Sequence, residues 1–477
     1  MTRNLAALFS AVAASAALLS ACGGGGGSVD TSPVSPAPPP PPPPGETRGT
    51  LLGTENLSTK STAQIDAFNQ DGSKGPVRPG ETATCAATFR QINYVTVDPQ
   101  GTTVTASAGL LVPVGDATCT QARPLVSFQH GTSDTNTFEG ANPGGTLSQT
   151  LAMYFVSHGY VVVVPDYLGY GASIGHYHPY VVAEAEATTV IDAVRAARNW
   201  FATSDGVNSG VTLNSQLFLS GTSEGGYVTM ATHRTMERDF PDEFQITADV
   251  PISGPYDLAS EVQTNLLEAD ATGNEEAGAT SFLLSGMQNT YGDIWTTPSE
   301  VFQPPWDQTA FNLFPSGVYS SDTDALNACQ IPFNITEYPS RPIGTCSRNP
   351  LLQPTFVSDY LAATPGTPGG IAQAHVVANG LISGWGNGGV NVAPMTVCYG
   401  DQDPTAMANA LSASTHLGVP AVNVQTPDDG ADPFIVQWMQ YVTLHPGDLQ
   451  YHGGIEAPGC TAYARYQVFD TYVSVVP

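Results

Sequence analysis

The segment Gln216–Met230 reads QLFLSGTSEGGYVTM. Its apolar first part is typical of a buried strand, and the part after Ser223 has the pattern of a helix. Glycines on both sides of the serine let the backbone crowd at a sharp turn, where side chains would clash. A Gly-x-Ser-x-Gly motif between a strand and a helix is the arrangement that exposes a nucleophilic serine. Ser223 is therefore the candidate nucleophile.

A second match to the same motif, GASIG at residues 171–175, centres on Ser173. It follows the loop-like stretch LGYGA, and Pro179 opposes a helix that begins at the serine. We therefore predict that Ser173 turns the chain over the sheet and is not the nucleophile.

Strand and helix patterns alternate on both sides of the opening segment. Strand patterns cover 89–98, 102–113, 124–132, 160–166, 243–254, 393–400 and 419–426, and helix patterns cover 145–159, 181–204, 224–240, 404–418 and 461–476. The alternation predicts an α/β protein with a mostly parallel sheet and helices on both faces, preceded by two antiparallel strands. Residues 257 to about 390 break the alternation and are too long for a structureless loop, so we predict an inserted cap domain there.

A serine hydroxyl needs a base to take its proton and an acid to orient that base. In this architecture the expected chain order is serine, acid, histidine. The stretch YGDQDPTA follows a late strand and offers Asp403, directly before a helix signal, with Asp401 as the alternative acid. The histidine should lie in a loop before the last helix, where His452 in YHGG is preferred to His445 in TLHPGD.

Two backbone N–H groups should stabilise the oxyanion of a tetrahedral intermediate. One is the N–H of Glu224, the residue after the nucleophile. The other is expected from Thr132, in the QHGT turn after an earlier strand. His130 in the same turn is expected to shape it, because it lies on the wrong element for a catalytic base.

Seven cysteines are present, and six remain if Cys22 belongs to a processed N-terminus. An even number in an exported chain indicates disulfides, for which several pairings are possible. Sequence proximity favours Cys85–Cys119 and Cys329–Cys346, which leaves Cys398–Cys460. That last bond would brace the acid-bearing strand against the segment after His452. No zinc-type spacing occurs, so we predict no metal site; His176 and His178 in HYH fit structural or substrate-rim roles better than metal ligation.

The N-terminal residues have the pattern of a targeting segment. Residues 1–21 have the pattern of a signal peptide, and LSAC at 19–22 resembles the lipobox of bacterial lipoproteins, with Cys22 as the lipidated residue. An ordinary cleaved signal peptide is the alternative. Residues 22–50 are rich in glycine and proline and predict a spacer. The remainder, 51–477, is the predicted folded domain.

The formal net charge of −28 makes nucleic acid an unlikely partner, since nucleic-acid binding needs a basic footprint. The motifs QHGT, VVPDYLGYGAS with its HPY, GTSEGGY, YGDQDP and YHGG together resemble the α/β-hydrolase superfamily, and within it the secretory-lipase-like branch of esterases and lipases. The resemblance covers roughly residues 80–477. It implies hydrolysis of a small-molecule, lipid or polymeric carboxylic ester through an acyl-enzyme, without metal or organic cofactor. With the lipobox, it implies an exported outer-membrane lipoprotein.

Two positions depart from the pattern of the branch. Glu224 places a charge beside the nucleophile, where it would tune the histidine or select substrates, and the acid motif ends in DPTA, where members of the branch more often have an apolar residue at the last position. Two other functions remain open at this stage. One is a serine peptidase of the aminopeptidase type on the same fold, and the other is a non-catalytic, lipid-anchored binding protein.

Overall fold

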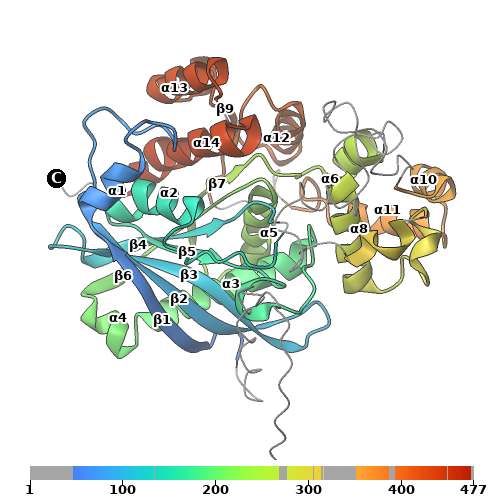
Figure 1. The fold of residues 1–477 in the computed structure, drawn as a ribbon, viewed down its shortest axis with the longest axis horizontal. Coiled ribbons are helices and arrows are strands. Elements are labelled where there is room, and N and C mark those ends of the chain that lie inside the picture. The colour runs from blue at the N-terminus through green and yellow to red at the C-terminus, as the bar shows by residue number, and fades with distance from the viewer. Residues whose placement is uncertain are drawn as a thin grey trace, which may run out of the picture. The chain divides into compact units, whose positions relative to one another are not determined.

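The described part of the chain contains a nine-stranded sheet, whose strands lie in the order β1-β2-β3-β5-β4-β6-β7-β8-β9 (Figure 1). The structure is a computed structural model that describes residues 47–133, 135–267, 277–304, 306–312, 315, 351–385, 393–447 and 449–473. All of them belong to the unit Pro38–Pro477. The pairs β1–β2, β2–β3 and β3–β5 are antiparallel, and the other neighbours are parallel. The predicted α/β class with a mostly parallel sheet is confirmed.

The strands are β1 (Leu51–Lys60), β2 (Ala86–Val97), β3 (Thr103–Val114), β4 (Gln121–Gln129), β5 (Val161–Pro165), β6 (Val211–Thr222), β7 (Ile246–Ile252), β8 (Val397–Tyr399) and β9 (Ala421–Asn423). Each predicted strand corresponds to one of them. The edge strand β1 was not predicted, because none of its residues is fully buried and its sequence therefore lacks an apolar pattern.

The helices are α1 (Thr62–Phe68), α2 (Thr146–Tyr154), α3 (Ala183–Trp200), α4 (Ser204–Asn208), α5 (Glu224–Asp239), α6 (Leu258–Glu261), α8 (Ala277–Tyr291), α10 (Pro354–Leu361), α11 (Pro368–Ala378), α12 (Pro404–Leu417), α13 (Pro433–Leu444), α14 (Ala457–Tyr463) and α15 (Asp470–Tyr472). Successive side chains of β5 point to opposite faces of the sheet. Val161 and Val163 pack in the apolar cluster that contains α3, whereas Val162 and Val164 pack with α1, α2, α13 and α14. Helices therefore cover both faces, as Figure 1 shows.

Between β7 and β8 the chain leaves the sheet and forms α6, α8, α10 and α11, which gather beside one another (Figure 1). Their buried side chains, such as Leu283 and Phe356, share one apolar cluster with Tyr227 of α5 and Ala410 of α12. These helices lie within the predicted insertion, and the cap domain with its limits at about 257 and 390 stays a prediction.

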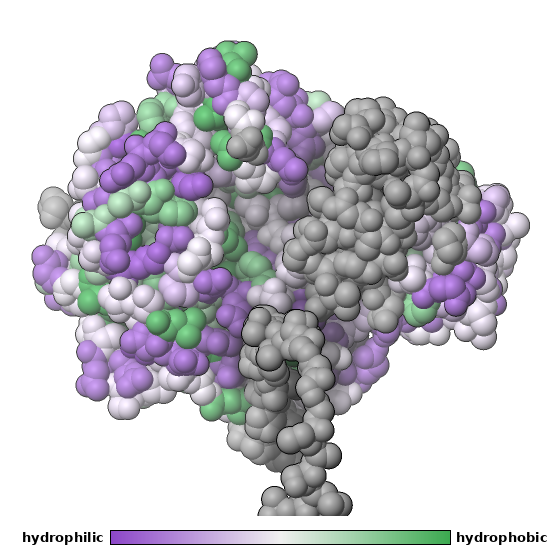
Figure 2. Space-filling model, viewed as in Figure 1, coloured by the Kyte–Doolittle hydropathy of each residue, from purple (hydrophilic) through white to green (hydrophobic). Residues whose placement is uncertain are grey.

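Two disulfides are present among the described residues, Cys85–Cys119 and Cys398–Cys460. The first joins the start of β2 to the loop after β3, and the second joins β8 to α14. The expected pair Cys329–Cys346, the lipobox cysteine and nearly all of the spacer lie outside the described residues. Among the described helices, none combines the length and the apolar character needed to span a bilayer. The molecular face in Figure 2 carries mainly hydrophilic and neutral residues, with hydrophobic ones scattered between them.

Candidate active site

Ser223 occupies a strained turn between β6 and α5. Its backbone has φ 60° and ψ −125°, a conformation that side-chain-bearing residues rarely adopt. The turn is held by the Ser223 N–H, which donates to the carbonyl of Ile252 at the end of β7 (2.9 Å). Strain of this kind persists only where the surrounding structure fixes it, and it is common at functional sites. The predicted strand, sharp turn and helix are all present.

The two motif glycines are required by close packing. A Cβ atom at Gly221 would lie 2.5 Å from the carbonyl oxygen of Gln129, and one at Gly225 would collide with the same oxygen. A Cβ at Gly131 would come within 3.4 Å of the Ser223 Cβ. The turn after β4, which contains Thr132, therefore lies directly against the serine turn.

Asp403 and His452 are brought together from segments that are separated in sequence by 49 residues. Asp403 is the N-cap of α12, where its Oδ1 accepts the N–H of Ala406 (2.9 Å). Its Oδ2 lies 2.7 Å from Nδ1 of His452. Adjacent parallel strands β6, β7 and β8 end at the same edge of the sheet, so the segments that follow them, with Ser223 and Asp403, lie on that edge.

The chain is similar to a known protein family and to several solved structures. Residues 145–306 match the secretory lipase family. The chain has the α/β-hydrolase fold and is similar to the secretory-lipase-like branch of esterases and lipases. The rice cell wall degrading esterase LipA from Xanthomonas oryzae is 27% identical, with a TM-score of 0.68, over 89% of this chain and 100% of that chain. No curated protein matches the chain.

Two further solved structures share the fold of the hydrolase. A putative hydrolase from Legionella pneumophila is 22% identical, with a TM-score of 0.60, over 77% of this chain and 88% of that chain. Candida antarctica lipase A in its closed state is 16% identical, with a TM-score of 0.51, over 79% and 75%. The family match and the similarity to the esterase LipA support a carboxylic ester hydrolase, and a secretory family with disulfides indicates an exported protein.

A second carboxylate, that of Glu456, contacts the candidate histidine His452 and was not predicted from the sequence. Oε2 of Glu456 lies 3.2 Å from Nδ1 of His452, and its Oε1 accepts the N–H of Gly400 (2.6 Å). The expectation that His452 lies in a loop was wrong. It lies in a π-helical turn, Tyr451–Glu456, at the start of the last helical run. The spacing of four residues between His452 and Glu456 was the available signal, because such pairs share a helix face.

The electrostatics of the hydrolase favour a charged resting histidine. Burial lowers the pKa of His452, but the hydrogen bonds to Asp403 and Glu456 outweigh burial and raise this pKa to about 10. Burial would raise the pKa of Asp403, yet the hydrogen bond from His452 holds this pKa below its usual value. Burial raises the pKa of Glu456. The His452 side chain is 44% exposed, so a substrate can reach it.

The rejected candidates have other contacts in the hydrolase. Oγ of Ser173 is buried and donates toward the carbonyls of Tyr167 and Tyr170. His445 caps the end of α13, with Nδ1 3.0 Å from the carbonyl of Tyr441. Among the described residues, no hydrogen bond joins the side chain of either residue to the serine turn.

Asp401 and His130 also have structural partners. The N–H of Asp401 donates to Gln425, and its carboxylate accepts from the side chain of Gln402. His130 donates from Nδ1 to the carbonyl of Gly131 (2.6 Å), and burial lowers its pKa to about 4. A neutral, buried His130 shapes the turn before Thr132, as expected.

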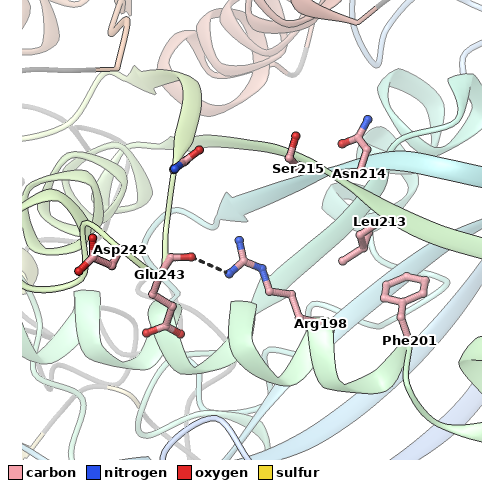
Figure 3. A pocket seen from close by; sticks show the side chains of 8 residues that line it. Arg198, Phe201, Leu213, Asn214, Ser215, Asp242 and Glu243 are labelled. Atoms are coloured by element: carbon pink, nitrogen blue, oxygen red, sulfur yellow. Dashed lines mark hydrogen bonds between the residues drawn. The ribbon is translucent and has the colours of Figure 1, made fainter.

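A hollow of about 450 Å³ on the hydrolase is not part of this site. Figure 3 shows its lining, in which Arg198 donates to the carbonyl of Glu243 beside Leu213 and Ser215. Leu213 and Ser215 lie in the first part of β6, whereas Ser223 follows its last residue. Because a strand rises about 3.3 Å per residue, the hollow and the serine lie toward opposite ends of this strand.

Proposed function

We propose that this exported hydrolase cleaves carboxylic esters through an acyl-enzyme on Ser223, with His452 as the base and Asp403 as its orienting acid. The observation that carries the proposal is the 2.7 Å contact between Asp403 and Nδ1 of His452, on the same sheet edge as the strained Ser223 turn. A contact at Nδ1 leaves Nε2 for proton exchange with the serine.

The proposed reaction has two halves. Neutral His452 takes the proton of the Ser223 hydroxyl through Nε2 while Oγ attacks the ester carbonyl carbon. The tetrahedral intermediate collapses, its alcohol leaves with the proton from His452, and the acyl group stays on Ser223. Water then attacks the acyl-enzyme with His452 again as base, and the carboxylic acid and free serine are released.

The proposed oxyanion hole consists of the N–H groups of Glu224 and Thr132. Glu224 is the first residue of α5, and the first N–H groups of a helix have no partner within it. The positive end of the helix dipole adds to their effect on a developing anion. The close approach of Gly131 to the serine turn supports the assignment of Thr132 as the second donor.

We assign the helical insertion at about 257–390 to a cap over this site. Phe282 of α8 stacks on Tyr180 at 4.5 Å between ring centroids. The Tyr180 hydroxyl lies 3.1 Å from Oγ1 of Thr132. One aromatic stack thus connects the insertion to the proposed oxyanion turn.

The buried state of Glu224 disfavours the peptidase alternative. A carboxylate that grips a free amine must face the substrate, but Glu224 is 1% exposed and paired with His178. We expect the protein to turn over p-nitrophenyl acyl esters. In a panel of esters of different acyl length and a polyester film, one kind of substrate should be cleaved clearly faster than the others. Amino-acid p-nitroanilides should stay at the level of the buffer. Rapid anilide cleavage with negligible ester cleavage would reject the ester hydrolase mechanism.

We also propose that the mature hydrolase is lipid-anchored through Cys22 and that residues 22–50 are its tether. The LSAC motif and the glycine- and proline-rich composition support this assignment. In a bacterial host fed an alkyne-tagged fatty acid, the wild-type chain should be labelled and sediment with membranes. Cys22→Ser should be unlabelled and lose membrane association. An unlabelled, fully soluble wild-type chain would instead indicate an ordinary signal peptide.

A further inference from the structure

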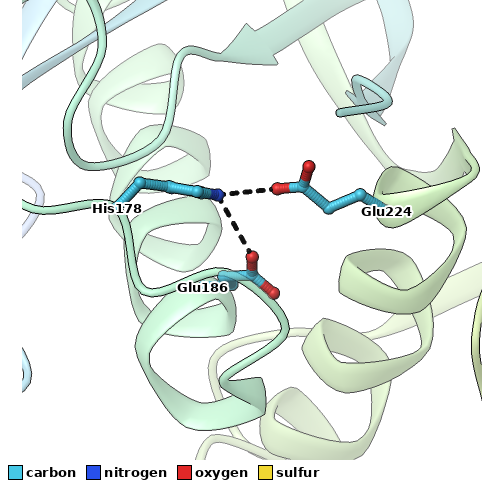
Figure 4. A group of neighbouring side chains, drawn as sticks. All are labelled: His178, Glu186 and Glu224. Carbon is cyan, nitrogen blue, oxygen red and sulfur yellow. Dashed lines mark hydrogen bonds and ion pairs between the residues drawn. The ribbon is translucent and has the colours of Figure 1, made fainter. Parts of the chain in front are cut away.

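Three ionisable side chains meet behind the serine turn, and all three are fully buried (Figure 4). His178 comes from the loop before α3, Glu186 from the first turn of α3 and Glu224 from the first turn of α5. Their polar atoms lie within 4.8 Å of one another. Burial of two carboxyl groups is unfavourable unless their charge is balanced.

The contacts of His178 show how the charge of the Glu224 carboxyl group is balanced. Nδ1 lies 2.9 Å from the carbonyl of Leu168, which can only accept, so Nδ1 carries a hydrogen. Nε2 lies 2.8 Å from Oε1 of Glu224. This contact requires one proton between the two atoms, so the His178–Glu224 pair has no net charge, whichever atom holds the proton.

Glu186 completes the cluster. Its Oε1 lies 3.6 Å from Nε2 of His178 and accepts the N–H of Val181 (3.1 Å). Burial first, and then the charge of Glu224, raise the pKa of Glu186 well above its usual value. Burial opposes ionisation of Glu224, but the charge of His178 and its hydrogen bond lower the pKa of Glu224. The raised pKa of Glu186 favours its protonated form, in which the cluster as a whole carries no net charge.

Aromatic side chains pack around this buried cluster. The ring of Tyr167 stacks on His178 at 5.8 Å between centroids, and Tyr170 and Phe282 contact it at 5.0 and 5.4 Å. His130 is neutral because burial lowers its pKa to about 4, so it adds no charge to the cluster. In such an environment the charge of Glu224 interacts strongly with any charge that forms nearby.

A negative charge does form nearby in the proposed reaction. Glu224 follows Ser223, and its N–H is one proposed donor to the oxyanion. An uncompensated carboxylate on the same residue would oppose the oxyanion and weaken the donor. We propose that His178 is a positioning residue, which neutralises and fixes the Glu224 carboxylate so that its N–H faces the oxyanion without an opposing charge. This inference rests on the proposed acyl-enzyme mechanism.

A double-mutant cycle on the full chain tests it, with kcat and KM measured for a p-nitrophenyl ester. Loss of one oxyanion donor costs about 10²–10³ in kcat, and His178→Ala should approach this loss with little change in KM. Adding Glu224→Gln to His178→Ala removes the stranded charge and should restore kcat at least about tenfold. His176→Ala, an exposed histidine two residues away, is the matched control and should retain wild-type kinetics.

A second variant covers failure of His178→Ala to fold. His178→Gln keeps a hydrogen-bond donor but cannot neutralise the Glu224 carboxylate, so it should fold, lose kcat and recover when Glu224→Gln is added. Binding of a trifluoromethyl ketone, which forms a tetrahedral adduct on the serine, should weaken in parallel with kcat.

Three results would overturn the inference. One is a double variant whose kcat loss equals the product of the single losses. The second is a lower melting temperature with unchanged kcat, which indicates a merely structural role. The third is a stoichiometric metal ion in the purified wild-type protein that is absent from His178→Ala. Failure of the acyl-enzyme mechanism itself is recognised separately, by activity that survives replacement of Ser223.

Discussion

Replacement of Ser223 by alanine should lower kcat for a p-nitrophenyl ester by about 10⁴–10⁶-fold. Alanine removes the only atom that can form the acyl bond, while the glycine-supported turn and the cap remain. KM should change little, because the hydroxyl contributes to bond formation and not to ground-state binding. Covalent labelling by a fluorophosphonate probe should disappear in the same variant.

The matched control is Ser173→Ala, which changes the serine of the other Gly-x-Ser-x-Gly segment. Its hydroxyl hydrogen-bonds to backbone groups of Tyr167, Gly169 and Tyr170, so folded protein should still label with the probe. Labelling that persists in Ser223→Ala, or a folded wild-type protein that never labels, would contradict the proposed nucleophile. The second outcome would favour a non-catalytic binding protein.

The second large effect is expected at the two acids of His452. An Asp-to-Asn change costs about 10⁴ in kcat where the aspartate is the sole partner of the histidine. Here Glu456 contacts the same Nδ1, so Asp403→Asn alone should cost only about 10–100-fold in kcat. The double variant Asp403→Asn/Glu456→Gln should approach the full loss. Equal activity of Asp403→Asn and the double variant would exclude a role for Glu456.

The pH dependence of Glu456→Gln provides an independent measurement. His452 acts as a base only when neutral, so kcat/KM rises as pH increases through its pKa. The two carboxylates raise the pKa of His452 to about 10, and removal of one of them lowers it. The acidic limb of the pH profile should therefore move to lower pH in this variant. A limb that stays in place would show that Glu456 does not act on His452 in the free enzyme.

The sequence predicted the parts of this molecule that local patterns encode. The all-apolar run 161–164 marked a central strand, and the glycines around Ser223 marked a tight turn, because burial and steric crowding act on neighbouring residues. Strand β1 and helix α13 were missed. The first lies at a sheet edge with no fully buried residue, and the second follows a loop-like acidic segment, so neither was read from its periodicity.

The site was predictable where chain order constrained it and hidden where tertiary contacts created it. Asp403 and His452 could be chosen because each follows a recognisable strand or precedes a helix. Glu456 could not, since the glycines at 453 and 454 suggested a loop although a π-helical turn forms there. The pairing of Glu224 with His178 joins residues 46 positions apart and has no local signature.

The Cys398–Cys460 disulfide also links folding of the site to the redox conditions of the compartment in which the chain folds. It closes a loop that contains both Asp403 and His452, with 62 residues of separation between the cysteines. Closing this loop restricts the unfolded chain in the region that must converge on Ser223. In a reducing cytoplasm the same segment would have to assemble without that restriction, and secretion into an oxidising compartment provides it. Production of the enzyme in a periplasm, with oxidative folding, is therefore the suitable route to active material.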